Sequence, residues 1–256
     1  MKIDRKKAEA VFREYVSHYN AGEEKVRLKI EHTFRVAGLC RQIAESLGME
    51  EEEQDLAWFT GLLHDVGRFE QLKNYGTFID ADSIDHAEYG AQILFEQGKI
   101  REYTREESED TLLWNAVRYH SAYRIPAMPE ERTERFCHIL RDADKIDILK
   151  VNVDFPPEEI YNVSSRELRS CTVSEAVMAA FYEEHAILRS LKKTAVDHLV
   201  GHISLVYELQ FPESRRIVNR QGYLPRLMAF ESQNPVTTDQ FRKIREYMEN
   251  YLERKG

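Results

Sequence analysis

Histidine and aspartate residues spread over the first 150 positions form a set that is suited to binding metal. His64 and Asp65 are adjacent, and the other candidates lie at long intervals: His32, His86, His120 and Asp144. Imidazole nitrogens and carboxylate oxygens are common ligands of divalent ions, and this set is large enough for one or two of them. The residue types therefore predict a centre for Mn, Fe, Ni, Zn or Mg.

The segment around the doublet resembles a known motif. Residues 61–68 read Gly-Leu-Leu-His-Asp-Val-Gly-Arg. The HD-domain superfamily of metal-dependent phosphohydrolases writes its doublet as two apolar residues, His, Asp, an apolar residue, Gly and a basic residue. The minimal family pattern maps onto His32, His64, Asp65 and Asp144, and the two-metal variant adds two histidines in the places of His86 and His120. The resemblance covers residues 27–149.

Three aspartates compete for the last ligand position. Asp142, Asp144 and Asp147 lie in one predicted helix, and the residues alone leave the choice open. In the family the ligand is the aspartate that precedes a basic residue. The resemblance therefore implies Asp144, which is followed by Lys145.

The resemblance also implies roles for these residues. The first ion would be held by His32, His64, Asp65 and Asp144, and the second by Asp65, His86 and His120. Asp65 would then be the catalytic residue that bridges both ions. Arg68 and Lys145 are expected to contact substrate. The alternatives are an ion pair between Arg68 and Glu70, and an ion pair of Lys145 beside the ligands.

The implied activity is hydrolysis of a phosphomonoester or phosphodiester in a small substrate, including a nucleotide, by a metal-activated water. Two alternatives use the same residues. One is a di-iron oxygenase with the HD fold, which redox-active iron and oxygen uptake would reveal. The other is a signalling protein that binds a nucleotide without turnover.

Composition limits the partners and the compartment. The formal net charge of -9 opposes binding to nucleic-acid polymers or anionic membranes, which relies on Lys and Arg. Cys40, Cys137 and Cys171 are odd in number and scattered, which predicts free thiols in a reducing compartment. No apolar run reaches the roughly 18 residues of a membrane span. We therefore expect a cytoplasmic protein with a small phosphorylated substrate; the oligomeric state is not indicated.

Apolar residues recur at helical spacing along the chain, so the predicted fold is an all-α HD-domain bundle with a helical C-terminal extension. Each ligand candidate is expected on the inward side of a core helix, as in bundles with internal metal sites. The helices expected to carry them cover residues 24–47, 51–65, a segment after the turn at 80–83, a segment from about 106, and 129–147.

Residues 154–157, Asp-Phe-Pro-Pro, interrupt this pattern and predict a boundary. We expect a catalytic core at 1–150 and an extension at 151–256 that packs on it, with helices at 174–191, 194–209 and 238–254. In the second of these, His198 and His202 are one turn apart. Such a pair can ligate metal, but no accompanying general-base pattern is present, so a structural role is expected.

Overall fold

A computed structural model describes residues 1–20, 22–128, 130–161 and 163–255, and no strand occurs in these ranges. The all-α prediction is therefore confirmed for the described chain. Pro129, where one core helix was expected to begin, lies outside these ranges. The chain divides into two compact units at residues 1–144 and 145–256, and α8 (Glu131–Asp154) continues through the division. The expected boundary after residue 150, and the packing of the extension on the core, stay predictions.

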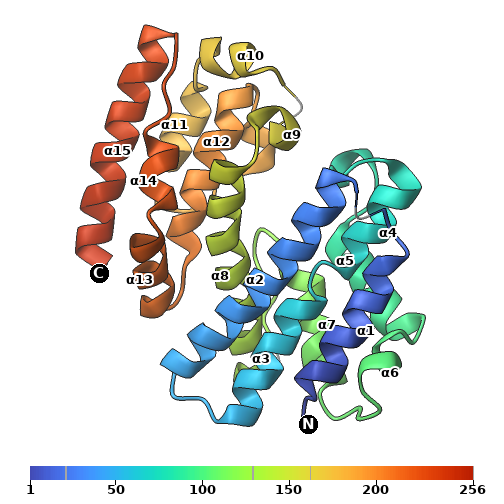
Figure 1. Ribbon diagram of the computed structural model, residues 1–256. Helices are drawn as coiled ribbons and strands as arrows, with labels where there is room; N and C mark the ends of the chain where they lie inside the picture. The colour runs from blue at the N-terminus through green and yellow to red at the C-terminus, as the bar shows by residue number, and fades with distance from the viewer. Residues whose placement is uncertain (21, 129, 162, 256) are drawn as a thin grey trace. The chain divides into compact units, whose positions relative to one another are not determined.

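The first unit contains the helices that precede α8, together with the first part of α8 (Figure 1). Their bounds are α1 (Arg5–Ser17), α2 (Glu24–Ser46), α3 (Glu51–Leu63), α4 (Val66–Tyr75), η1 (Asp80–Asp82), α5 (His86–Ala91), η2 (Gln92–Glu96), α6 (Ile100–Tyr103) and α7 (Asp110–Tyr119).

The second unit contains the end of α8 and the helices that follow it. Their bounds are α9 (Pro157–Tyr161), α10 (Ser165–Ser170), α11 (Glu175–Phe181), η3 (Arg189–Leu191), α12 (Ala195–Ile203), η4 (Ser204–Glu208), α13 (Pro212–Gln221), α14 (Tyr223–Met228) and α15 (Pro235–Lys255).

Two glycines allow the close helix contacts that assemble the first unit. Gly61 of α3 lies against α2, where a Cβ would come within 2.6 Å of the Ala37 Cα. Gly67 of α4 lies against α5, where a Cβ would collide with the backbone carbonyl of His86. A larger side chain at either position would push two helices apart, because the obstructing atoms belong to the backbone.

The helix boundaries differ from the expected ones where the His-Asp doublet lies. A single helix was expected through residue 65, but α3 ends at Leu63 and α4 begins at Val66. Asp65 has φ -104° and ψ 16°, outside the helical range, so the chain bends at the doublet. The Tyr15 hydroxyl of α1 donates to the Val66 carbonyl at 3.0 Å and thereby holds this bend. Hydrophobic periodicity continues on both sides of the bend, which is why sequence alone did not reveal it.

Other expected helices are also shorter or displaced. The helix before His120 begins at Asp110 rather than near 106, and the segment 174–191 forms a helix only up to Phe181. Glu184, with φ 56°, lies in the left-handed region shortly after that helix end and is incompatible with its continuation.

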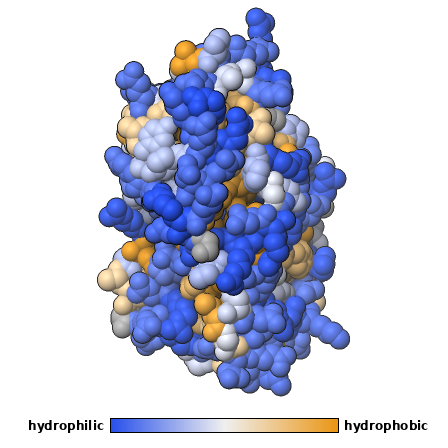
Figure 2. All heavy atoms as spheres, turned by 90° about the vertical axis from the view of Figure 1, so that its left-hand side faces the viewer, coloured by the Kyte–Doolittle hydropathy of each residue, from blue (hydrophilic) through white to orange (hydrophobic). Residues whose placement is uncertain are grey.

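The molecular face drawn in Figure 2 is mostly hydrophilic, with apolar residues in small groups. In the described ranges, no helix combines the length and the apolar character that crossing a membrane requires.

Candidate metal centre

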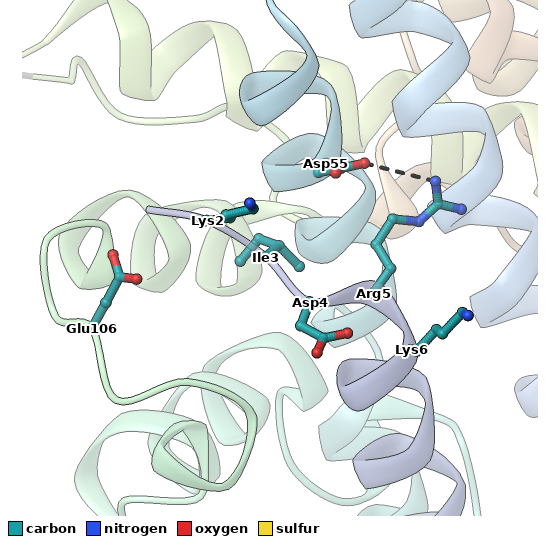
Figure 3. Close-up of a pocket in the computed structure, with 7 residues that line it drawn as sticks. All are labelled: Lys2, Ile3, Asp4, Arg5, Lys6, Asp55 and Glu106. Carbon is teal, nitrogen blue, oxygen red and sulfur yellow. Dashed lines mark ion pairs between the residues drawn. The ribbon is translucent and has the colours of Figure 1, made fainter.

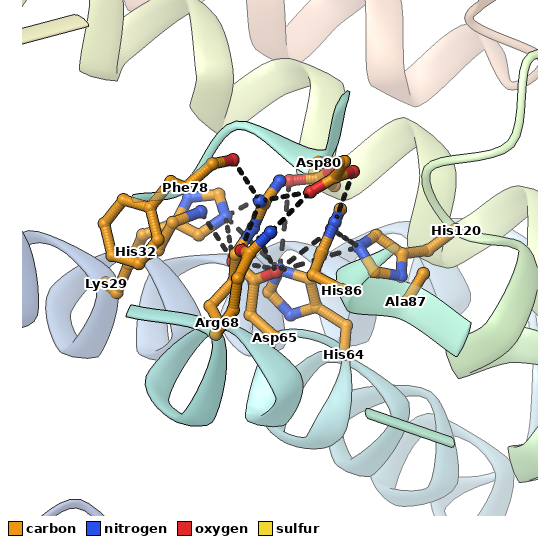
Figure 4. Close-up of polar contacts among 12 residues, drawn as sticks. Lys29, His32, His64, Asp65, Arg68, Phe78, Asp80, His86, Ala87 and His120 are labelled. Atoms are coloured by element: carbon orange, nitrogen blue, oxygen red, sulfur yellow. Dashed lines mark hydrogen bonds and ion pairs between the residues drawn. The ribbon is translucent and has the colours of Figure 1, made fainter. Parts of the chain in front are cut away.

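The six predicted ligands come together in the first unit, at the bend between α3 and α4. All of them except Asp144 are labelled in Figure 4. His32 comes from the middle of α2, Asp144 from α8, and His86 from the first position of α5. His64 and His120 directly follow the last residues of α3 and α7. The four histidines and Asp65 are at most 3% exposed, and the side chain of Asp144 is 13% exposed.

One group of donor atoms consists of His32, His64, Asp65 and Asp144. The Nε2 atoms of His32 and His64 are 3.2 Å apart. His32 Nε2 is 3.1 Å from Asp144 Oδ1 and 3.6 Å from Asp65 Oδ2. His64 Nε2 is 3.4 Å from Asp65 Oδ2 and 3.9 Å from Asp144 Oδ1. Asp144, chosen from the resemblance, is thus placed beside both histidines.

A second group consists of His86, His120 and the other oxygen of Asp65. The Nε2 atoms of the two histidines are 3.1 Å apart. They lie 3.6 Å and 3.7 Å from Asp65 Oδ1. The two oxygens of Asp65 therefore face different histidine pairs, which is the arrangement of a carboxylate that bridges two positions.

Hydrogen bonds on the far side of the imidazoles determine which nitrogen faces the centre. His64 Nδ1 donates to the Gly61 carbonyl and His120 Nδ1 to the Val117 carbonyl, each at 2.7 Å. His86 Nδ1 donates to Asp80 Oδ2 at 2.8 Å. Because these acceptors have no proton to give, each neutral imidazole presents an unprotonated Nε2 to the centre.

These tautomers bring lone pairs into contact. The Nε2 lone pairs of His86 and His120 face each other at 3.1 Å, which is repulsive unless a cation lies between them. Two ligands bound to one ion at about 2.1 Å are roughly 3.0 to 3.4 Å apart for angles of 90° to 109°. The nitrogen–nitrogen separations of both groups agree with this range. The shortest nitrogen–oxygen separations agree with it in the first group, at 3.1 and 3.4 Å, and exceed it slightly in the second group, at 3.6 and 3.7 Å. The residues therefore fit divalent ions.

The electrostatic environment favours the ligand forms of these groups. Burial, together with the nearby His86 and His64, lowers the pKa of His120 to about 3, so its imidazole is neutral. Burial opposes ionisation of Asp65, but Lys29 and the histidines outweigh it and hold the pKa of Asp65 well below its ordinary value. Asp144 behaves in the same way, because its contact with His32 outweighs burial and lowers its pKa.

Two residues at the centre were not found from the sequence. Lys29, one turn before His32, places its Nζ 2.7 Å from Asp65 Oδ2. Asp80 accepts from His86, from Arg68 Nη1 at 2.7 Å and from Gln71 Nε2 at 2.9 Å. For Lys29 the helical spacing from His32 was the available signal. No comparable signal existed for Asp80, which appeared only as part of a turn.

The predicted substrate contacts have different surroundings. Arg68 Nη1 donates to Asp80, to Gln71 Oε1 and to the Phe78 carbonyl, while Glu70, the alternative partner, accepts from Tyr19. The Arg68 Nε is buried without a hydrogen-bond partner in the described ranges and lies 3.7 Å from Asp65 Oδ1. Lys145 follows Asp144 in α8 and is 8% exposed; its contact with substrate stays a prediction.

A hollow of about 660 Å³ near the N-terminus is a separate feature of the first unit (Figure 3). It is lined by Lys2, Ile3, Asp4, Arg5, Lys6, Asp55 and Glu106. None of the six predicted ligands is among them, and Arg5 pairs with Asp55 at 3.7 Å. The hollow is therefore not part of the candidate metal centre.

Comparisons with known proteins agree with the residues of this site. Residues 30–149 match the family model of the HD domain. The 3'3'-cGAMP-specific phosphodiesterase 1 of Vibrio cholerae is 27% identical over 100 residues, which are 35% of this chain and 23% of that protein. This chain thus matches less than a quarter of that relative's length.

A solved structure described as a predicted HD superfamily hydrolase, from an uncultured Thermotogales bacterium, has a TM-score of 0.44 and 16% identity. The alignment covers 98% of this chain and 93% of that one, but a likeness this weak supports no conclusion. The family match is the stronger finding, and it contains all six predicted ligands and Asp80, whereas Lys29 lies one residue before it. Residues 30–149, a little under half of the chain, carry an HD domain.

Proposed function

We propose that this protein is a metal-dependent phosphohydrolase that holds two divalent ions and cleaves a small phosphate ester. The observation that carries the proposal is the position of Asp65. Its Oδ2 faces His32 and His64, and its Oδ1 faces His86 and His120, at 3.4 to 3.7 Å. A single carboxylate between two pairs of inward-facing imidazoles is suited to bridging two ions.

Two basic side chains beside Asp65, Lys29 and Arg68, favour a substrate that carries negative charge. Lys29 contacts Oδ2 and the Arg68 Nε lies near Oδ1, so each oxygen has one cation near it. The side chains of Lys29 and Arg68 are 16% and 15% exposed, whereas Asp65 is 2% exposed. Both cations are therefore more accessible to a ligand from solvent than the Asp65 carboxylate beside them. This favours a phosphate ester over the oxygenase alternative, since dioxygen carries no charge for these residues to bind.

The relative named as a phosphodiesterase gives further support to the phosphate ester, although it shares only one region with this chain. Phosphomonoesters and phosphodiesters, nucleotides included, both agree with the two cations.

The chain's own residues would act in three ways. His32, His64, Asp65, His86, His120 and Asp144 would hold the ions. When bound, the ions polarise the phosphoryl group and lower the pKa of a water from about 15.7 toward about 7. Asp65 orients the two halves of the centre relative to each other. Lys29 and Arg68 bind the phosphate oxygens and neutralise charge that develops during attack.

The test combines metal content with turnover. Protein purified without added metal is analysed for Mn, Fe, Ni and Zn, and then assayed for phosphate release from a panel of esters and for oxygen uptake. We expect about two ions per chain and metal-dependent phosphate release that Asp65→Ala abolishes. Asp82→Ala is the control, because Asp82 is an exposed carboxylate of η1. Oxygen uptake by an iron-loaded protein that releases no phosphate would refute the proposal.

A further inference from the structure

Arg141 of α8 lies against the end of α7, directly where His120 follows that helix. Its Nη1 is 3.1 Å from the Tyr119 carbonyl and 3.3 Å from the His120 carbonyl, and it also contacts the Ala122 carbonyl. Its Nη2 is 3.4 Å from the Tyr123 carbonyl. Arg141 is only 6% exposed, so these contacts are shielded from water. One guanidinium therefore gathers four backbone carbonyls around His120.

These contacts stand in the place of a glycine cap. The last carbonyls of a helix have no partner inside it, and a glycine in the left-handed conformation often satisfies them. The helices α4 and α13 end in this way, at Gly76 and Gly222, both with φ 69°. At the end of α7, His120 has φ -62° and ψ -36°, and no residue of the described segment 120–128 has a positive φ. The Tyr119 carbonyl accepts instead from Arg141 and from the Ala122 N–H.

The guanidinium fixes the backbone on both sides of His120. The Tyr119 carbonyl belongs to the peptide group before the His120 Cα, and the His120 carbonyl belongs to the one after it. Because both are bound to the same nitrogen, rotation of either peptide group breaks a hydrogen bond. The imidazole depends on this backbone, since His120 Nδ1 donates to the Val117 carbonyl at 2.7 Å. A fixed backbone therefore keeps His120 Nε2 directed at His86 and Asp65, at 3.1 and 3.7 Å.

The same helix supplies a ligand of the other group. Asp144 follows Arg141 by three residues in α8, so the two side chains leave the helix on the same side. Asp144 Oδ1 is 3.1 Å from His32 Nε2. Thus α8 reaches the first group directly, through Asp144, and the second group indirectly, through Arg141.

Arginine is suited to this position for two reasons. Its planar guanidinium has five N–H donors in a fixed arrangement, whereas lysine has three donors on one atom and methionine has none. Its permanent charge also stabilises the partial negative charge of the carbonyls at a helix end.

We propose that Arg141 is a positioning residue of the metal centre, which holds the backbone at His120 so that this imidazole stays in place for the second ion. The inference rests on the two-ion centre of the proposed function, but not on the substrate or the reaction. Arg141 acts through the His120 backbone, as its contacts show. Its loss should therefore weaken one ion about tenfold, the lower end of the range for groups that orient a ligating histidine.

The first test needs no metal. Protein with ¹⁵N-labelled histidine is prepared metal-free, and long-range ¹H–¹⁵N correlation spectra report which nitrogen of each imidazole carries the proton. His120→Gln identifies the signals of His120. We expect a single tautomer with the proton on Nδ1 in the wild type. In Arg141→Met we expect a mixture of both tautomers, because the contact of His120 with the Val117 carbonyl loosens.

Calorimetric titration of the metal-free protein with Mn²⁺ or Zn²⁺ then compares the two binding events. We expect Arg141→Met to weaken one of them about tenfold and to leave the other close to that of the wild type. Arg141→Lys keeps the charge but has fewer donors, so it should show smaller changes of the same kind. This variant carries the test if Arg141→Met does not fold.

Arg132→Met is the matched control. Arg132 also belongs to α8, but it donates to Glu109 at the beginning of α7 and to Glu53 of α3, in each case at 2.7 Å. Its loss should lower the melting temperature without changing the His120 tautomer or the affinity for either ion. A single Nδ1–H tautomer in both Arg141 variants, or an equal change in Arg132→Met, would overturn the proposal. A wild type that binds no ion would refute the proposed function, and the spectra of the metal-free protein would still decide the role of Arg141.

Discussion

Asp80→Asn tests whether the second half of the metal centre depends on one carboxylate outside the ligand set. Asp80 Oδ2 accepts a hydrogen bond from His86 Nδ1 at 2.8 Å. Its Oδ1 accepts from Arg68 Nη1 at 2.7 Å and from Gln71 Nε2 at 2.9 Å. Burial opposes ionisation of Asp80, but His86 and Arg68 outweigh it and lower its pKa. The carboxylate therefore aligns a ligand and a cation at the same time.

Asparagine has the same shape but only one acceptor oxygen. If its amide nitrogen faces His86, two donors meet and the imidazole loses the contact that orients Nε2. If it faces Arg68, the guanidinium loses its carboxylate. Loss of such a partner of a ligating histidine costs about 10- to 100-fold in metal affinity, or roughly 1.4 to 2.7 kcal/mol.

We expect the loss to fall on one ion only, because Asp80 is paired with His86 of the second group and not with His32 or His64 of the first. Calorimetric titration of metal-free protein with Mn²⁺ or Zn²⁺ should show one binding event with the affinity of the wild type, assigned to the first group. The affinity of the other binding event, assigned to the second group, should be reduced. Asp82→Asn, in the same η1 turn and exposed, should titrate like the wild type. If Asp80→Asn bound both ions with the affinities of the wild type, or lost affinity for both ions equally, this reasoning would be refuted.

Gly61→Ala should destabilise the protein by about 1–3 kcal/mol in urea unfolding, whereas Gly38→Ala, in open space on α2, should be neutral or stabilising; equal effects would contradict the close contact. Lys29→Met should raise the KM for a phosphate ester about tenfold while metal content is kept, and Lys25→Met, one turn earlier, should not; an unchanged KM would exclude Lys29 from substrate binding. The pKa of Lys192 is about 8 in the folded chain and 10.5 in the unfolded chain. Between pH 8 and pH 10.5 the unfolded chain therefore binds more protons than the folded chain, and the free energy of unfolding rises with pH in this window. The stability gained by Lys192→Met, at most about 3 kcal/mol, should be largest below pH 8 and shrink toward pH 10.5 in denaturant titrations; a constant gap would contradict a buried ammonium group.

Much of the candidate centre was predictable because its signals are local. The order of His32, His64, Asp65, His86, His120 and Asp144 can be read along the chain, and each was expected near the inward side of a helix. Helical periodicity also predicted an all-α fold, which the described residues confirm. The spacing of His198 and His202 was visible too, but within the described ranges neither histidine belongs to a group of side chains with metal-ligand spacing.

Some features of the centre depend on contacts between segments that are far apart in the sequence, and only the tertiary structure revealed them. The bend at Asp65, the approach of helices at Gly61 and the contact of Asp80 with His86 join residues whose separation along the chain carries no distance information. The sequence by itself determined which groups are available for metal chemistry, because residue types and helical period are properties of the chain. Which oxygen of Asp65 faces which histidine pair, and which cation meets it, was decided only by packing, because these distances depend on how helices far apart in sequence are held together.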